Sequence, residues 1–168
     1  MNYSKINFTD IANGYGVRVS IFVSGCTNHC EGCFQPETWD FNYGKEFTQE
    51  TMDLLLNKLE PKFIQGLTIL GGEPMDNPEG TEWIIKETRK KFGNKKDIWV
   101  YTGYVLKTLL EKKRTEHIEN ILSNIDMLVA GPFVLEKKTD IMPFRGSTNQ
   151  RLIDSELLAE CLKKTFCT

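Results

Sequence analysis

The chain has 168 residues, of which 40% are hydrophobic and 26% are charged, and its formal net charge at pH 7 is −2. These values are typical of a soluble globular protein and exclude a disordered or fibrous one. The length suits one domain over residues 1–168 and is too short for two comfortable domains. The small negative charge gives no general attraction to nucleic acid, so neither DNA nor RNA is expected as a partner.

Neither a secretory signal nor a membrane span is apparent. The first twenty residues carry Lys5, Asp10 and Arg18 and lack a continuous apolar stretch. No apolar run approaches the roughly 20 residues that a membrane span needs, so a cytoplasmic protein is expected. Basic residues within 89–96 and at 112–114 are interpreted as solvated faces of helices, with a docking surface for an acidic partner as the alternative.

Helical and strand patterns alternate along the chain. In chain order they predict a strand over 17–23, a helix over 48–60, a strand over 66–70, a helix over 77–92, a strand over 97–101, helical sequence over 105–123, a strand over 126–130 and a helix over 154–164. Strands that alternate with helices pair in parallel through right-handed crossovers. The expected class is therefore α/β with a mainly parallel sheet.

Four unusual peptides each follow the carboxyl end of a predicted strand. They are the cysteine-rich segment 24–33 and the peptides 71–74, 102–104 and 131–133. Parallel α/β folds place their sites at this end of the strands. We therefore expect the four peptides to converge on one cleft.

The cysteines give the most specific signal. Cys26, Cys30 and Cys33 form a C-x3-C-x2-C run, which is compact enough for one loop to wrap a single metal centre. In a reducing compartment such cysteines are more typical of metal or catalytic groups than of disulfides. Three thiolates can hold three irons of a four-iron cluster, which usually takes four cysteines. The fourth iron would stay open to a chelating ligand.

Other metal sites remain possible at this point. A structural zinc site of the Cys3His type could include His29, although His29 directly precedes Cys30 and adjacent residues rarely both reach one ion. A ferredoxin-like electron carrier would need a fourth ligand. Cys161 and Cys167 lie far along the chain and are interpreted as incidental.

The cysteine run and the turn Gly71-Gly72-Glu73-Pro74 together resemble the radical S-adenosylmethionine superfamily. The resemblance implies a 4Fe-4S cluster on the three cysteines and a contact of the turn with the amino group of S-adenosyl-L-methionine. Glycines let a backbone come close to a ligand, and the Glu73 carboxylate can accept a hydrogen bond from an ammonium group.

Further blocks narrow the resemblance to the activating enzymes of anaerobic ribonucleoside-triphosphate reductase. These blocks are residues 10–18, 22–26, 38–39, 99–104, 131–134 and 145–151. The resemblance as a whole extends from about residue 2 to residue 154. Members of this family are uniformly this short and are incomplete (β/α) barrels, so the same fold is expected here. The family usually has an Asp where this chain has Ala130.

The resemblance also implies a mechanism and partners. Reductive cleavage of S-adenosyl-L-methionine would give a 5′-deoxyadenosyl radical, which would abstract a hydrogen atom from a glycine of the reductase. The implied partners are that reductase and a flavodoxin-like or ferredoxin-like electron donor. The implied cluster ligands are Cys26, Cys30 and Cys33, the implied cofactor pocket comprises Gly32, Cys33, Phe34, Gly71, Gly72 and Glu73, and further candidates are Tyr101, Thr102 and Arg145.

Two alternative functions are also compatible with the sequence. One is an activase of another glycyl-radical enzyme, such as pyruvate formate-lyase. The other is a zinc-binding adaptor without catalysis. A full (β/α)8 barrel needs about 250 residues, so this shorter chain is expected to leave a gap through which a protein loop can enter.

Overall fold

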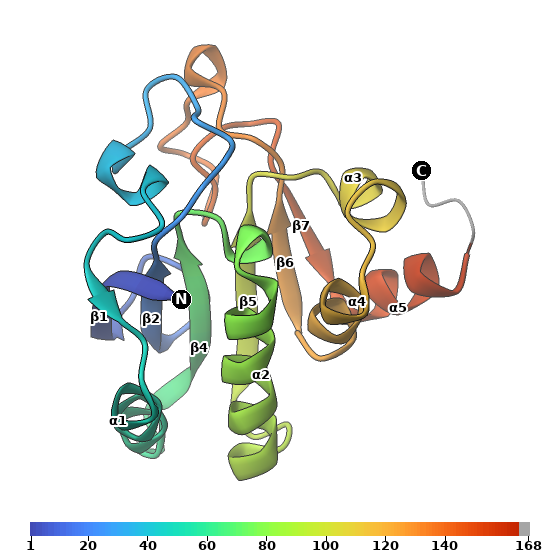
Figure 1. Cartoon of the computed structure of the whole chain (residues 1–168). Helices are drawn as coiled ribbons and strands as arrows, with labels where there is room; N and C mark the ends of the chain where they lie inside the picture. The colour runs from blue at the N-terminus through green and yellow to red at the C-terminus, as the bar shows by residue number, and fades with distance from the viewer. Residues whose placement is uncertain (165–168) are drawn as a thin grey trace.

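The computed structural model describes residues 1–164, in which helices pack on a seven-stranded sheet (Figure 1). The strands are β1 (Asn2–Asp10), β2 (Val17–Val23), β3 (Lys45–Glu46), β4 (Ile64–Gly71), β5 (Asp97–Thr102), β6 (Met127–Ala130) and β7 (Arg151–Asp154). The helices are α1 (Gln49–Leu59), α2 (Pro78–Phe92), α3 (Leu106–Glu111), α4 (Glu116–Ser123) and α5 (Ser155–Lys163), with short 3-10 helices η1 (Pro36–Trp39), η2 (Pro74–Asp76) and η3 (Leu135–Lys137). Within residues 1–164 no helix is long and apolar enough to cross a membrane.

The sheet has the strand order β3-β1-β2-β4-β5-β6-β7. The central neighbours β2, β4, β5 and β6 pair in parallel, whereas β1, β3 and β7 pair antiparallel at the two edges. The α/β class is confirmed. The sheet is mixed and open, so it does not confirm the expected incomplete barrel. The short turn between β1 and β2 explains one antiparallel edge, because a parallel pair would need a long crossover.

The two faces of the central strands have different surroundings. Side chains on one face pack with the helices in the main core; they include Val19, Ile21 and Val23 of β2, Leu67 and Ile69 of β4, and Ile98 and Val100 of β5. The alternating side chains belong to the opposite face, because successive residues of a strand point to opposite sides. There the rings of Tyr15 and Phe144, from two loops, pack edge-on against Trp99 at 5.5 and 5.3 Å between ring centroids. Loops rather than helices therefore cover this second face.

Local capping explains where several helices begin. The Thr48 hydroxyl accepts a hydrogen bond from the N–H of Thr51 and caps α1, as its sequence predicts. The expected helical stretch over 105–123 is two helices, because Thr115 caps α4 by accepting from the N–H of Ile118 at 3.2 Å. The basic segment 112–114 therefore lies between α3 and α4 rather than on a helix.

The interpretation of the basic runs as solvated faces is wrong for two side chains. Lys96 is only 7% exposed, and its ammonium donates to the carbonyl oxygens of Ile64 at 2.5 Å and Pro61 at 2.9 Å. Its long apolar stem lets the charged end reach these carbonyls at the start of β4. Arg89 forms an ion pair with Asp126 at 2.6 Å, which ties α2 to the segment before β6.

Candidate active site

The cysteine loop, residues 24–33, follows the carboxyl end of β2 and lies against η1. The backbone N–H of Cys26 donates to the carbonyl oxygen of Trp39 at 3.2 Å. Cys26 is 8% exposed, Cys30 and Cys33 are half-buried, and all three are free thiols. The loop thus presents three sulfur donors from a backbone that is anchored at its first cysteine.

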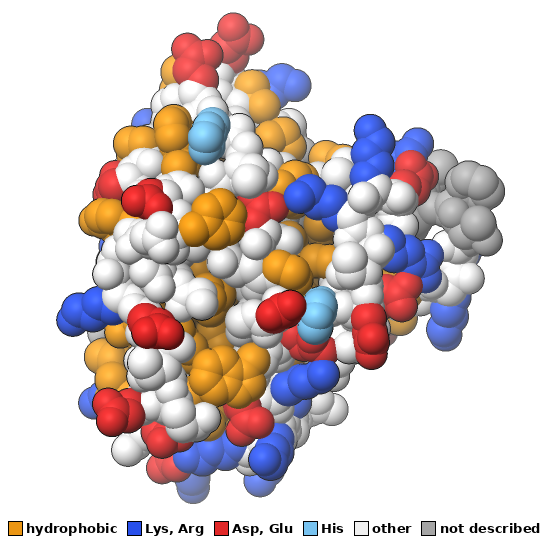
Figure 2. Space-filling view, in the orientation of Figure 1, with side chains coloured by type: hydrophobic (Ala, Val, Ile, Leu, Met, Phe, Trp, Pro, Cys, Tyr) orange, Lys and Arg blue, Asp and Glu red, His pale blue; other side chains and the backbone are white. Residues whose placement is uncertain are grey.

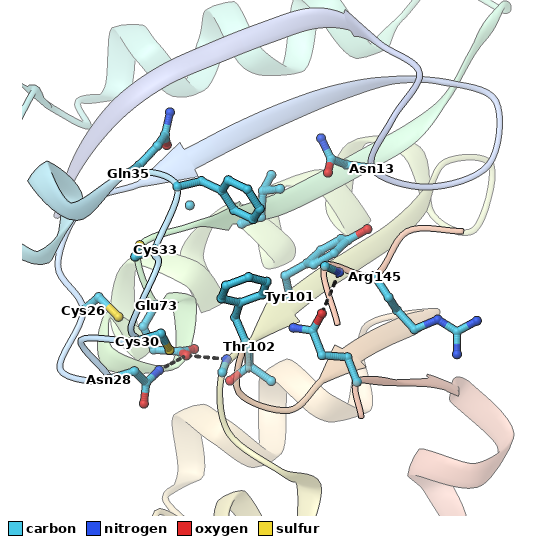
Figure 3. A pocket seen from close by; sticks show the side chains of 18 of the residues that line it. Asn13, Cys26, Asn28, Cys30, Cys33, Gln35, Glu73, Tyr101, Thr102 and Arg145 are labelled. Carbon is cyan, nitrogen blue, oxygen red and sulfur yellow. Dashed lines mark hydrogen bonds between the residues drawn. The ribbon is translucent and has the colours of Figure 1, made fainter. Parts of the chain in front are cut away.

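A cavity of about 770 Å³ lies at the carboxyl ends of the central strands. All four of the peptides expected at one cleft line it, through Cys26, Cys30 and Cys33, through Gly71, Gly72 and Glu73, through Thr102 and Gly103, and through Gly131 and Phe133. Their predicted convergence is confirmed. Figure 3 shows the three cysteines with Asn28 and Glu73 at one end of the cavity, and Asn13, Tyr101 and Arg145 toward the other.

The Gly71-Gly72 turn brings its backbone into close contact with β2. The N–H of Gly72 donates to the carbonyl oxygen of Val23 at 2.7 Å. Gly71 has φ +109°, and a Cβ at this position would lie 2.7 Å from backbone atoms of Phe22. Both the backbone conformation and the lack of space require glycine at position 71.

Glu73 is fully buried, and N–H donors hold both of its carboxyl oxygens. Oε1 accepts from the backbone N–H of Met75 at 3.0 Å, and Oε2 accepts from the N–H of Gly103 at 2.7 Å and from Nδ2 of Asn28 at 2.8 Å (Figure 3). Burial raises the pKa of Glu73 to about 7, although these backbone hydrogen bonds act in the opposite direction. The carboxyl group can therefore ionise near neutral pH and accept from an ammonium ligand.

The chemistry of the thiols fits an iron–sulfur cluster. Burial raises the pKa of the Cys26 and Cys30 thiols, and the negative charge of Glu73 acts in the same direction. A bound metal deprotonates such thiols outright. Within residues 1–164 no three His, Cys, Asp or Glu side chains converge closely enough to hold a single ion. Cysteine thiolates are the ligands that hold a 4Fe-4S cluster, so the donor set of this loop fits such a cluster.

The His29 ring does not lie with the three thiols. It stacks on Trp39, with ring centroids 4.5 Å apart and an interplanar angle of 23°, and it is not among the residues that line the cavity. The closed Cys3His arrangement of a structural zinc site is therefore not formed in the described part of the chain.

The remaining expected pocket residues have different positions. Phe34 lines the cavity, is 69% exposed, and has its ring centroid 5.2 Å from that of Phe133. Gly32 does not line the cavity; it has φ +73°, and a Cβ there would meet a methyl group of Leu135 at 2.9 Å. Cys161 belongs to α5 and packs in the core, away from the cavity lining, and Cys167 lies outside the described residues.

Tyr101, Thr102 and Arg145 all line the cavity. The Tyr101 hydroxyl is buried and has no hydrogen-bond partner among residues 1–164. Burial also raises the pKa of Tyr101, so this hydroxyl stays protonated and can donate. Asn13 lines the same end of the cavity, and its backbone carbonyl accepts from the Thr68 hydroxyl at 2.8 Å.

Sequence reasoning missed two side chains at the cysteine end. Asn28 bonds Glu73, which is 45 residues away, and Asp76 bonds Thr27, which is 49 residues away. No local spacing relates these positions. The only available signals were that Thr27 and Asn28 lie inside the cysteine run and that Asp76 closely follows the glycine turn.

Comparison with known proteins gives a family match over most of the chain. Residues 12–153 match the family described as a 4Fe-4S single cluster domain. The anaerobic ribonucleoside-triphosphate reductase-activating proteins of Haemophilus influenzae, Vibrio cholerae and Escherichia coli are 38%, 35% and 37% identical to it over 154 residues. Each alignment covers 89% of this chain and 96% of the other protein.

Proposed function

Because the chain belongs to the family of anaerobic ribonucleoside-triphosphate reductase-activating proteins, we propose that it activates such a reductase by forming a glycyl radical on it. The observation that carries the proposal is that Cys26, Cys30, Cys33 and the Gly71–Glu73 turn line a single cavity. A cluster and a cofactor with an ammonium group can therefore be held side by side.

We propose that Cys26, Cys30 and Cys33 each bind one iron of a 4Fe-4S cluster, so that the fourth iron is open to S-adenosyl-L-methionine. When bound, the reduced cluster would supply one electron for reductive cleavage of that cofactor, and this chemistry would provide the radical character needed to remove a hydrogen atom from a glycine of the reductase. The protein's own contribution is to position these groups and to exclude water.

The Gly71–Glu73 turn would hold the methionine end of S-adenosyl-L-methionine. The ionised Glu73 carboxylate accepts from the ammonium group, and its three N–H donors keep the oxygens oriented. Gly71 and Gly72 leave the backbone free of side chains at this wall of the cavity. Phe34, which lines the cavity and is largely exposed, is suited to contact the adenine ring.

The far end of the cavity is suited to the protein substrate. Asn13, Tyr101 and Arg145 offer polar groups there. Their distance from the cysteine end leaves them free to contact a peptide segment of the reductase. The open sheet would correspond to the incomplete barrel of the superfamily, whose gap admits such a segment. A flavodoxin-like or ferredoxin-like protein in the cytoplasm would supply the electron.

Anaerobic reconstitution with iron and sulfide, followed by reduction, tests this function. We expect 5′-deoxyadenosine to form, and a glycyl-radical resonance to appear on added anaerobic reductase. Cys30→Ser should abolish both products, whereas Glu31→Gln, an exposed change in the same loop, should retain them.

Two outcomes would contradict the proposal at different levels. Formation of 5′-deoxyadenosine with a radical on pyruvate formate-lyase but not on the reductase would show that the partner is wrong. A fully loaded protein that forms neither product would refute the catalytic function itself.

A further inference from the structure

An ion pair between a buried carboxylate and a Lys113 side chain that is 37% exposed lies beside the cysteine loop. The Asp76 side chain in η2 is 4% exposed, and its Oδ1 atom is 3.1 Å from the Lys113 ammonium. Oδ1 also accepts from the Tyr104 hydroxyl at 2.7 Å. Lys113 belongs to the basic segment that follows α3, where Lys and Arg side chains gather on the surface (Figure 2).

The other oxygen of Asp76 holds the cysteine loop. Oδ2 accepts from the backbone N–H of Thr27 at 2.9 Å and from its hydroxyl at 2.7 Å. The Thr27 hydroxyl is also 2.9 Å from the hydroxyl of Tyr104. Since Thr27 directly follows Cys26, one negative charge and its positive partner are fixed close to the first cysteine.

None of these four side chains lines the cavity, so they are not placed to contact a ligand in it. Burial raises the pKa of Asp76, but hydrogen bonds from Tyr104, Thr27 and Lys113 outweigh burial and hold that pKa below its ordinary value. The carboxylate therefore stays ionised near neutral pH.

We propose that the Asp76–Lys113 pair is a positioning device that orients the cysteine loop through Thr27 and sets the reduction potential of the cluster. One-electron reduction adds a negative charge to the cluster. A nearby carboxylate disfavours that charge and a nearby ammonium favours it, and both effects are strong where water does not screen them. The proposal rests on the cluster being held by the three cysteines and is independent of which protein is activated.

The test is a potentiometric titration of the reconstituted holoenzyme, monitored by the electron paramagnetic resonance signal of the reduced cluster. Asp76→Asn removes the negative charge and should raise the midpoint potential. Lys113→Met removes the positive charge and should lower it. The Asp76→Asn shift should approach a tenfold change in the reduction equilibrium, which is about 59 mV for one electron, and the Lys113→Met shift should be smaller because water partly screens the Lys113 ammonium. Lys113→Arg should restore the original potential.

Matched variants separate charge from structure. Tyr104→Phe removes a hydrogen bond to Asp76 without changing any charge, so it should shift the potential by less than the two charge variants do. Glu50→Gln and Lys90→Met make the same charge changes at exposed positions and should leave the potential unchanged.

Shifts of equal sign for Asp76→Asn and Lys113→Met, or shifts no larger than those of the exposed controls, would overturn the proposal. If Asp76→Asn fails to retain a cluster, Lys113→Met and its Arg rescue decide the question alone. Failure to activate any reductase would leave these potentials measurable, so it would refute the proposed function without touching this inference.

Discussion

The carboxyl group of Glu73 is buried in the wall of the cavity, and the chain provides it with N–H donors but no cation in hydrogen-bond contact among residues 1–164. Burial raises its pKa to about 7, so both the neutral and the ionised form of Glu73 are populated near neutral pH in the absence of a ligand. An ammonium group next to the carboxylate favours its ionised form. Cofactor binding and deprotonation of Glu73 should therefore be linked.

We expect the affinity of the cluster-loaded protein for S-adenosyl-L-methionine to rise about tenfold from pH 6 to pH 8 and then to level off, because ionised Glu73 is the form that accepts from the ammonium. Glu73→Gln should weaken binding roughly 10-fold to 100-fold at pH 8, the range for a hydrogen bond to a charged group. Anaerobic equilibrium dialysis measures both effects.

The Gln variant also provides the control, since it cannot titrate. Its affinity should be nearly constant over the same pH range. A wild-type affinity that is equally flat would show that Glu73 does not bind the ammonium group.

At the scale of single residues, the sequence could predict the site residues that lie close together in the chain. The three cysteines and the glycine turn could be identified because each set lies within a few residues of chain. The supporting contacts could not, because the partner of Asn28 is 45 residues away and that of Thr27 is 49 residues away. Such pairs are defined by the strand order, which spacing does not encode.

The contact between α2 and α4 contains a titrating pair. His117 Nδ1 of α4 bonds Oε2 of Glu82, which is only 5% exposed on α2. Oε1 of Glu82 also pairs with Lys86 at 2.5 Å, while Glu79 lies 3.9 Å from Nε2 of His117. The hydrogen bond from Glu82 raises the pKa of His117, with Glu79 and Glu116 acting in the same direction.

The sign of the pH dependence follows from that raised pKa. Protonated His117 stabilises the fold fully below its unfolded value near 6.5, and this contribution is lost as the pH rises through the higher folded value. Hydrogen bonds to His117 and Lys86 outweigh the effect of burial and lower the pKa of Glu82 to about 2, so Glu82 stays ionised across this window.

We expect His117→Gln to lower the Tm by roughly 2–4 °C at pH 6 and by less at pH 8.5. Anaerobic thermal unfolding of the cluster-loaded protein, followed by circular dichroism, measures the difference. Glu82→Gln should reduce the same pH dependence. If both variants keep the wild-type pH profile between pH 6 and 8.5, the pair does not contribute in this way.

Among the elements, those with strong periodicity could be predicted and short edge elements could not. The four central strands and the helices α1, α2 and α5 were predicted close to their observed bounds. The strands β1, β3 and β7 were missed; β3 has two residues and β7 has four, too few for a period-2 pattern to be recognised, whereas the nine residues of β1 do alternate and were overlooked. The break between α3 and α4 depends on the cap at Thr115. Because the surrounding residues are polar and favour helix, the sequence did not show that a second helix begins there.

In the whole molecule, the two faces of the sheet have different roles: one face packs in the hydrophobic core, and the loops on the other help to form the cavity. The helices lie against one face of the sheet (Figure 1) and bury its apolar side chains. Loops cover the other face, and the cavity lies at the carboxyl ends of the strands. The alternation of strands with helices predicted a parallel sheet, and therefore that the four peptides after its strands would meet at one edge. It could not predict how far the sheet curves or whether it closes, because those properties depend on strand pairing at the edges.

The loop between β6 and β7 forms one rim of the cavity and carries an exposed apolar side chain. Ile141 is 93% exposed, although its neighbours Asp140 and Met142 line the cavity. An isolated apolar side chain of this size would be buried if a protein docked over the rim, with a gain of about 1.5–3 kcal/mol. Phe63, which is 66% exposed, directly precedes β4 at the opposite end of the parallel strands and is a matched control.

We expect Ile141→Asp to raise the KM for the reductase at least about tenfold, because the variant loses the apolar contact and would bury an unpaired charge on docking. Slow cleavage of S-adenosyl-L-methionine in the absence of the reductase should be unchanged, since Ile141 is not among the residues that line the cavity. Phe63→Asp should change neither quantity. Steady-state formation of the glycyl radical at varied reductase concentration measures the KM. If both variants raise it equally, the reductase does not dock over this rim, and the opening between the loops is not the entrance for the glycine segment.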